Sequence, residues 1–196
     1  MTPIVIENAI PKSYQDSISS MVYSRDFPWN SVHERYSDGT CSWSFSYLAN
    51  NDGPNDPAGS TSMPACNLLM PVAYTMADAI GKKLTKLLRI RIGLLLPNPP
   101  QAIGDDVVFV ETNYGGDEAH IDFRIPHYTG LYYVNDCDGD TIIYNEKKPM
   151  DQYTELYRSS PSKGKICVFD GEHYHASSKP KNSYGRIVVS YNFIAE

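Results

Sequence analysis

The chain has 196 residues, a length that suits one domain with a single hydrophobic core, and we expect residues 1–196 to form one domain. Its 41% hydrophobic and 20% charged residues exclude a disordered, collagen-like or coiled-coil chain. The formal net charge of -6 provides no broad positive surface for phosphate backbones or anionic membranes. We therefore expect no general nucleic-acid binding and no membrane partner.

The spacing of the cysteines and the length of the apolar runs indicate the cellular compartment. Four cysteines stand far apart without a C-x-x-C pair, which favours reduced thiols: Cys41, Cys66, Cys137 and Cys167. The first residues lack a basic region before a long apolar stretch, and the longest apolar run, Ile92 to Pro97, is too short to span a bilayer. We expect a soluble cytoplasmic protein without a signal peptide or transmembrane segment.

In chain order, the first elements form a β-then-α opening. Ile4 to Ile6 predicts a short strand, and Ser13 is expected to cap a helix that runs to about Tyr23. From Cys41 to Leu48, aromatic residues alternate with serines. This period of two predicts a strand with one aromatic, buried face and one small, polar face.

The middle of the chain predicts a loop and then one long helix. Asn50 to Pro64 concentrates Asn, Asp, Gly, Pro and Ser, as loops do. Helical spacing from Asn67 to about Leu88 predicts a helix that braces a sheet. Beyond it the expected strands are Arg89 to Leu96, Val107 to Glu111, Gly130 to Val134, Thr141 to Tyr144, Lys165 to Phe169 and Arg186 to Phe193. About eight short strands after the first helices predict a mainly β fold, a double-sheeted sandwich or jelly roll supported by helices.

Asn145 to Gly164 is longer than a usual hairpin connection and mixes charges with Tyr153 and Tyr157. It is a candidate lid or substrate loop, and a decorated surface loop is the alternative.

His120-Ile121-Asp122 places an imidazole and a carboxylate on one face of a strand, where both can bind one metal. A third ligand is available in His175, just before the last long strand. Two His and one carboxylate leave three positions of an octahedral ion open, as in non-haem Fe(II) oxygenases. A structural zinc site would need four protein ligands. Alone, H-x-D also arises by chance on ordinary strands.

Arg186 opens the apolar strand that follows His175. A guanidinium on a largely buried segment needs an anion, and its fork matches a carboxylate. An acidic cosubstrate that chelates the iron at one end and binds Arg186 at the other accounts for both features.

The order and spacing of these motifs resemble the Fe(II)/2-oxoglutarate-dependent dioxygenases, nearest to the prolyl-4-hydroxylase-like branch and its small bacterial and phage members. The matching elements are His120-x-Asp122, Leu131-Tyr-Tyr-Val-Asn135, Asp138-Gly-Asp-Thr141, Gly164-Lys-Ile-Cys-Val-Phe169, His175 and Arg186. The resemblance implies a double-stranded β-helix, or jelly roll, whose major sheet is buttressed by N-terminal helices.

The same resemblance implies roles for individual residues. His120, Asp122 and His175 would ligate Fe(II), and Arg186 would bind the distal carboxylate of 2-oxoglutarate. Tyr133 would add a hydroxyl to that carboxylate, whereas its neighbour Tyr132 must face the other side of the strand.

This chain departs from many relatives at Val188, where they place a hydroxyl two residues after the arginine. The supporting hydrogen bond must therefore be absent or come from Thr141, Tyr114 or Tyr133.

Three further histidines are weighed as ligands. His173 competes with His175, but the family spacing to the arginine favours His175, and His173 falls in the preceding turn. His33 and His127 have no partner at ligand spacing and are expected to be surface or hydrogen-bonded residues.

The resemblance implies hydroxylation of an unactivated C–H with release of succinate and CO2, and it implies ascorbate as a further cofactor. It favours a prolyl side chain in a protein or peptide, with a free amino acid, a nucleobase or another metabolite as alternatives. A cupin-like metal enzyme would leave Arg186 unexplained. A noncatalytic jelly-roll binding or virion-associated module predicts a missing ligand.

Overall fold

The computed structural model describes residues 1–32, 42–48, 63–97, 101–103, 106–108 and 119–196. Two helices lie in this part of the chain, α1 (Lys12–Val22) and α2 (Met63–Ala79). Its strands are β1 (Ile4–Ile6), β2 (Asn30–Val32), β3 (Ser42–Leu48), β4 (Leu84–Leu95), β5 (Gln101–Ile103), β6 (Asp106–Val108), β7 (Tyr128–Tyr133), β8 (Thr141–Tyr144), β9 (Glu155–Ser159), β10 (Ile166–Asp170), β11 (His175–Ser177) and β12 (Arg186–Ala195).

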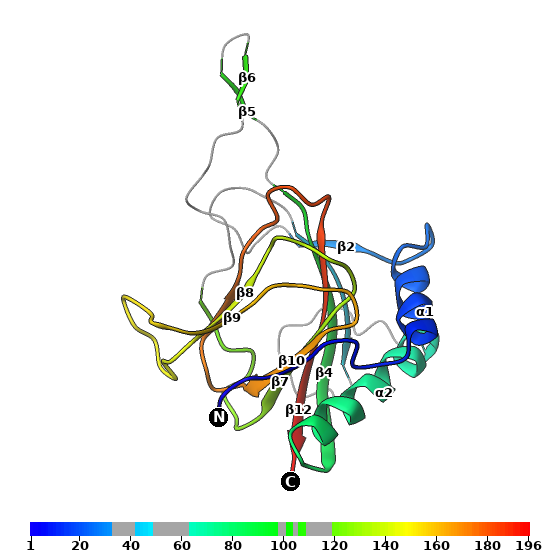
Figure 1. Cartoon of the computed structure of the whole chain (residues 1–196), viewed down its shortest axis with the longest axis vertical. Helices are drawn as coiled ribbons and strands as arrows, with labels where there is room; N and C mark the ends of the chain where they lie inside the picture. The colour runs from blue at the N-terminus through cyan, green and yellow to red at the C-terminus, as the bar shows by residue number, and fades with distance from the viewer. Residues whose placement is uncertain (33–41, 49–62, 98–100, 104–105, 109–118) are drawn as a thin grey trace.

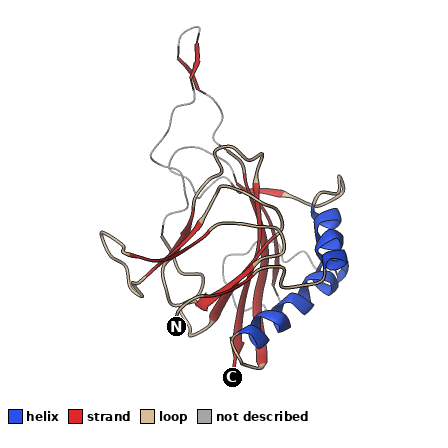
Figure 2. Ribbon diagram, viewed as in Figure 1, coloured by secondary structure: helices blue, strands red, loops and turns tan. Residues whose placement is uncertain are grey.

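The strands form two main antiparallel sheets. The large sheet has the order β1-β10-β7-β12-β4-β3-β2, and the small sheet has the order β11-β8-β9. β5 and β6 form a separate pair. Figures 1 and 2 show α1 and α2 on one side of the large sheet and the strands β8 and β9 on its other side. The expected mainly β fold with supporting helices is therefore confirmed.

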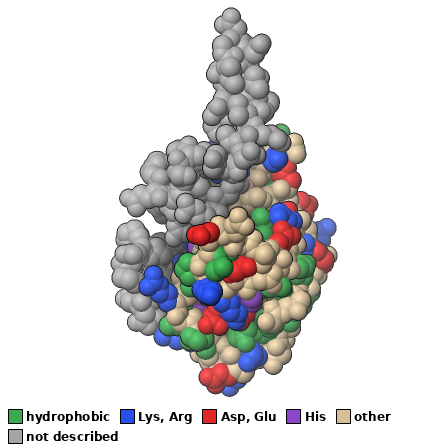
Figure 3. All heavy atoms as spheres, turned by 90° about the vertical axis from the view of Figure 1, so that its left-hand side faces the viewer, with side chains coloured by type: hydrophobic (Ala, Val, Ile, Leu, Met, Phe, Trp, Pro, Cys, Tyr) green, Lys and Arg blue, Asp and Glu red, His purple; other side chains and the backbone are tan. Residues whose placement is uncertain are grey.

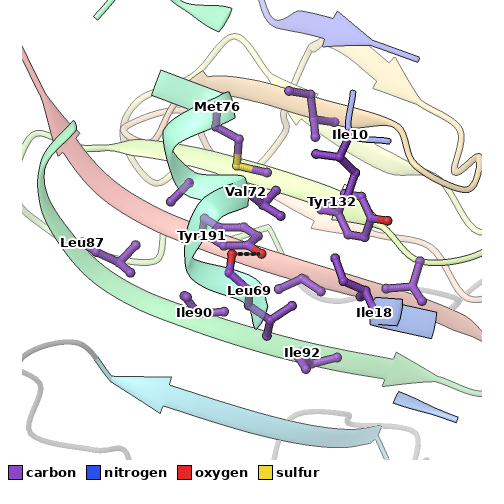
Figure 4. Close-up of a cluster of buried hydrophobic side chains, with 14 of the residues drawn as sticks. Ile10, Ile18, Leu69, Val72, Met76, Leu87, Ile90, Ile92, Tyr132 and Tyr191 are labelled. Atoms are coloured by element: carbon purple, nitrogen blue, oxygen red, sulfur yellow. Dashed lines mark hydrogen bonds between the residues drawn. The ribbon is translucent and has the colours of Figure 1, made fainter. Parts of the chain in front are cut away.

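The main core lies between the helices and the large sheet. Alternate residues of β12 face the helices, and these are Ile187, Val189, Tyr191 and Phe193. Leu69, Val72 and Met76 of α2 recur at helical spacing and pack against the same cluster (Figure 4). The Tyr191 hydroxyl donates to the Leu69 carbonyl at 3.0 Å, which ties the helix to the central strand.

A second apolar cluster lies on the other face of the large sheet. Leu131 and Tyr133 of β7, Val188 of β12 and Ile143 of β8 are buried in it. Because successive side chains of a strand point to opposite faces, Tyr132 belongs to the helix side and Tyr133 to the side of the small sheet. This alternation places the remaining polar residues of β12 between the two sheets.

The turn at Asp138 and Gly139 carries the chain from the large sheet to the small one. The Asp138 carboxylate accepts backbone N–H groups of residues 181–183, which precede β12. Burial alone would raise the pKa of Asp138, but the hydrogen bonds from Asn182 and Ser183 lower it to about 2. A Cβ at Gly139 would lie 2.7 Å from the Ser178 carbonyl oxygen, so a glycine is needed at this crossing.

The long helix predicted from Asn67 to Leu88 is wrong at its end. α2 stops at Ala79, and Gly81 follows with φ +69°, a left-handed conformation suited to a helix end. The Lys82 amide donates to the Ala77 carbonyl at 3.0 Å and closes the last turn. β4 then begins at Leu84, earlier than expected, because the apolar run fits a strand paired along its length with β12.

Two further expectations need correction. Ser13 does not cap α1, since Pro11 holds the N-cap position and no side chain caps the helix. The described residues contain twelve strands instead of about eight, and the missed ones include β9, which lies inside Asn145 to Gly164. That segment is therefore not a single loop.

Other expectations agree with the structure or lie outside it. β1, β3, β7, β8, β10 and β12 form where strands are predicted, to within two residues at each end. Most of the Asn50 to Pro64 loop and the end of the Val107 to Glu111 strand lie outside the described residues. Cys66, Cys137 and Cys167 are free thiols, whereas Cys41 is not described. In the described part of the chain, neither helix is long and apolar enough to cross a membrane.

The described part of the face that carries β9 is mixed in charge. Figure 3 shows basic side chains interspersed with acidic ones there. Arg158 of β9 pairs with Glu155, and Lys147 pairs with Asp170. The coloured atoms of this face thus include no broad basic patch of the kind that a phosphate backbone requires.

The core packing predicts a large cost for truncation at the centre of β4. Ile92 is 0% exposed, so Ile92→Ala is expected to lower the free energy of unfolding by about 2–5 kcal/mol through lost contacts and a cavity. Leu96→Ala is the control, because Leu96 is 41% exposed and should cost far less. Urea denaturation of both variants checks this, and equal losses would contradict the packing.

Candidate metal centre

His120, Asp122 and His175, which the sequence predicts as ligands, come together in the structure. One nitrogen or oxygen atom from each lies within 4.8 Å of the others, as a shared metal ion requires. The Nε2 atom of His175 is 3.7 Å from Oδ2 of Asp122, and both side chains are 8% exposed. This is a half-buried donor set of two imidazoles and one carboxylate.

A single β-bridge sets the separation of the two histidines. His120 and His175 exchange backbone hydrogen bonds of 3.0 and 2.9 Å, and their ring centroids are 4.7 Å apart. The expected strand at His120 is thus reduced to one bridge at the edge of the small sheet, beside β11. The juxtaposition that the sequence predicts is still achieved.

Hydrogen bonding and packing orient the His175 ring. Its Nδ1 atom lies 3.2 Å from the His173 carbonyl oxygen and carries the proton in that contact. Nε2 faces Asp122 and, when the ring is neutral, carries the lone pair that a metal would take. Phe169 packs edge-on against the ring, with centroids 5.2 Å apart.

Asp122 is held by two residues that the sequence analysis missed, Arg89 and Asn192. Arg89 donates to Oδ1 of the carboxylate, and the Asn192 amide donates to Oδ2 at 2.9 Å. Burial alone would raise the pKa of Asp122, but the positive charge of Arg89 and the neighbouring histidines outweighs it and keeps the pKa well below its usual range. The carboxylate is therefore ionised and ready to bind a cation.

A signal for Asn192 was present in the sequence. It is six residues after Arg186, and on a strand with a period of two both side chains face the same side. Arg89 gave no such signal, because its strand was expected to begin at that residue.

A pocket extends from the metal ligands between the two sheets. It is lined by Arg89, Arg91, Gly93, Leu94, Leu95, His120, Asp122, Leu131, Thr141, His175, Ser177, Arg186, Val188 and Ser190. A Cβ at Gly93 would meet no atom within 4 Å, so this glycine leaves open space in the pocket wall. The metal ligands and Arg186 thus share one cavity.

Arg186 is 2% exposed and is fixed at its base. Its Nε atom donates to the Gly139 carbonyl at 2.8 Å, and Nη2 donates to Oγ1 of Thr141 at 2.5 Å. Among the described residues no carboxylate forms an ion pair with it. Because a buried charge without a counterion is costly, the cavity is suited to an anionic ligand.

The structure distinguishes between the candidate hydroxyls. Thr141 lines the pocket, and its Oγ1 accepts hydrogen bonds from Arg186 and, at 3.0 Å, from the Tyr133 hydroxyl. The Thr141 hydrogen therefore remains available for an anion. Tyr133 is not among the pocket-lining residues, and burial raises its pKa to about 12, so it acts as a donor to Thr141. Tyr114 lies outside the described residues.

The two other described histidines stay outside the cluster. His173 is buried, and its Nδ1 lies 2.8 Å from the Tyr144 carbonyl oxygen. His127 is also buried, with Nδ1 2.7 Å from the Ile125 carbonyl oxygen. His33 is not described.

The candidate lid, Asn145 to Gly164, contributes no side chain to the pocket wall. Its Tyr153 ring stacks on Tyr174 and contacts Tyr144, which fastens the segment to the small sheet. In this structure the segment is an ordered extension of β8 and β9.

No family model and no curated protein sequence matches the chain. Solved structures do match its fold. An oxidoreductase of the 2OG-Fe(II) oxygenase family from Burkholderia pseudomallei aligns over 98% of this chain and 85% of its own, with a TM-score of 0.65 and 12% identity. A Pseudomonas putida prolyl-4-hydroxylase aligns over 100% and 93%, with a TM-score of 0.58 and 13% identity.

The epimerase SnoN, solved with Fe3+, alpha ketoglutarate and nogalamycin RO, aligns over 98% of this chain and 78% of its own, with a TM-score of 0.61 and 9% identity. At these identities the similarity shows the fold alone. The chain thus has the fold of the 2OG-Fe(II) oxygenases, and the resemblance suggested by the sequence motifs is confirmed at that level.

The geometry predicts that His175 and not His173 binds a metal. His175→Ala is expected to weaken Mn(II) binding about 100-fold or more, because loss of a direct ligand exceeds the ~10–100-fold cost of losing an outer partner. His173→Ala is the matched control and should bind within a few-fold of wild type. Electron paramagnetic resonance of free Mn(II) measures the affinity of both variants. Weaker binding by His173→Ala than by His175→Ala would identify His173 as the ligand instead.

Proposed function

We propose that residues 1–196 form one Fe(II)- and 2-oxoglutarate-dependent dioxygenase domain that hydroxylates an unactivated C–H bond. The observation that carries this proposal is the presence in one pocket of a His-Asp-His cluster and a buried arginine with no acidic partner among the described residues. The first can hold a divalent metal, and the second can hold the far end of an acidic cosubstrate.

We infer that the two sheets form a jelly roll. Apart from the separate pair β5 and β6, the chain from β4 onward crosses repeatedly between the two sheets. It passes from β4 (large) to the His120 bridge (small), β7 (large), β8 and β9 (small), β10 (large), β11 (small) and β12 (large). This order winds the chain as a double-stranded β-helix. The ligands then lie at the edge of the small sheet and the arginine on the large one, with the pocket between them.

The donor set fits Fe(II). Two imidazoles and one carboxylate leave three positions of an octahedral ion open, whereas a structural zinc site would need a fourth protein ligand. When bound, iron and 2-oxoglutarate would together supply the oxidation of the C–H bond by dioxygen, which places one oxygen atom in the product and one in succinate, with release of CO2. The protein supplies ligands, orientation and a pocket shielded from water.

Arg186 and Thr141 are suited to the distal carboxylate of 2-oxoglutarate. The guanidinium is already anchored on Gly139 and Thr141, so it keeps its orientation without a ligand. Leu131 and Val188 provide apolar walls for the carbon chain. Thr141 thereby supplies the hydroxyl that Val188 cannot.

For the substrate we propose a prolyl side chain in a peptide or protein, and ascorbate as a supporting reductant. The sequence motifs resemble the prolyl-hydroxylase-like branch, and the fold of the Pseudomonas putida prolyl-4-hydroxylase covers the whole chain. Because SnoN has a similar fold and was solved with a small molecule, a free amino acid, a nucleobase or another metabolite is the alternative outcome of a substrate screen.

Binding of 2-oxoglutarate tests the cosubstrate assignment. Anaerobic addition of Fe(II) and then 2-oxoglutarate is expected to produce the visible charge-transfer band of the chelate. Arg186→Leu should raise the 2-oxoglutarate concentration that gives half of the maximal band intensity about 100-fold or more. The reason is that each charge-assisted hydrogen bond contributes about 1.5–3 kcal/mol. Arg158→Leu, an exposed arginine on β9, is the control.

Gly93→Val is a second probe of the same pocket. Its methyl groups would enter the open space and should weaken 2-oxoglutarate binding while Mn(II) affinity stays unchanged. An absent band in wild type despite bound iron would favour a cupin-like enzyme, and absence of metal binding would favour a noncatalytic module.

Turnover tests the reaction and the substrate class. Prolyl peptides incubated with the iron-loaded protein, 2-oxoglutarate and ascorbate are expected to gain one oxygen atom by mass spectrometry, with matching succinate. His120→Ala should abolish both products because it removes a metal ligand. Succinate without peptide oxidation would point to a small-molecule substrate.

A further inference from the structure

Three cross-strand neighbours form a polar row on the pocket side of the large sheet. Asn192 of β12 is paired in register with Arg89 of β4 on one side and with Thr129 of β7 on the other. Residues paired in this way share a face of the sheet. The pairing of β12 with β4 shifts in register between Asn192 and Phe193. Such β-bulges re-aim side chains next to functional sites.

Two members of this row, Arg89 and Asn192, form a closed ring of hydrogen bonds with the Asp122 carboxylate. Arg89 donates through Nη2 to Oδ1 of Asp122 and through Nε to Oδ1 of Asn192 at 3.1 Å. Asn192 completes the ring by donating through Nδ2 to Oδ2 of Asp122 at 2.9 Å. The Phe123 ring lies against the guanidinium, with 5.2 Å from Cζ to the ring centroid.

The donors and acceptors of this network allow one orientation. Arg89 can only donate, so the Asn192 oxygen must face it, and the Asn192 amide group then points to Asp122 and, at 3.2 Å, to Oγ1 of Thr129. The Thr129 hydroxyl lies 3.4 Å from Nε2 of His127. Nδ1 of His127 lies 2.7 Å from the Ile125 carbonyl oxygen, to which it donates.

We propose that Arg89 and Asn192 are positioning residues that present a single oxygen of Asp122, Oδ2, to the metal. This inference rests on the proposed function. Each oxygen of the carboxylate accepts one hydrogen bond, Oδ1 from Arg89 and Oδ2 from Asn192, and so keeps one lone pair. Oδ2 is the oxygen that lies on the side of His175, 3.7 Å from its Nε2 atom, where a shared metal would lie. One-oxygen ligation by Asp122 would leave three positions of an octahedral ion for ligands from outside the protein.

Metal affinity of the purified full chain tests the proposal without turnover. Asn192→Leu and Arg89→Met are each expected to weaken Mn(II) binding about 10–100-fold, the usual cost of losing a partner of a metal ligand. The double variant should be little worse than the poorer single variant, because the two residues belong to one ring. Lys83→Met, which removes an exposed cation just before β4, is the control and should match wild type.

Arg89→Lys tests whether the geometry of the Arg89 side chain matters or only its charge. It also replaces Arg89→Met as the test if that variant does not fold. A lysine keeps the positive charge but lacks the fork that reaches Asp122 and Asn192 together. Weakened binding with an unchanged unfolding temperature of the metal-free protein supports positioning. Full recovery of wild-type affinity in Arg89→Lys, or undiminished affinity in both Asn192→Leu and Arg89→Met, would overturn it.

The same titration keeps the two proposals apart. If wild-type protein binds no Mn(II) or Fe(II), the proposed function fails. If wild type binds the ion and the variants bind it equally well, only the positioning role fails. The charge-transfer band with 2-oxoglutarate adds a second readout, since a reoriented Asp122 should shift its energy.

Discussion

The alternation of side chains along β12 is the constraint on which both the core and the site depend. Odd-numbered residues from Ile187 to Phe193 bury apolar surface against the helices, while even-numbered residues face the small sheet. Each face requires the other, because a shift of one residue in register would bury Arg186 in the helix-side core and expose Tyr191 to the pocket. The apolar face therefore fixes where the polar groups stand.

The two arginines that the site uses differ in a way that indicates its chemistry. Arg89 has a carboxylate partner within the protein, Asp122, and the pair is stabilised by Asn192. Arg186 donates to a carbonyl and a hydroxyl, and no carboxylate among the described residues neutralises its charge. A fold keeps such a cation at a cost in free energy, and the cost is offset when an anion binds.

The sequence was sufficient to place the residues whose chemistry is unusual. A His-x-Asp pair, a later histidine and an arginine at the start of an apolar strand predicted the site because few structural roles require that set. Arg89 could not be found in this way, since its role depends on the register of β4 against β12. The end of α2 was missed because Leu84, Leu87 and Leu88 continue a helical spacing, and only the pairing of this segment with β12 decides for a strand.

The backbone bridge between His120 and His175 has a consequence for folding. These residues are far apart in the chain, and the segment around His120 is joined to β11 by one pair of backbone hydrogen bonds. So slight an attachment opens at low free energy compared with the central strands. An ion bound by both histidines would act as a crosslink across this edge, so metal loading would slow amide hydrogen exchange there first.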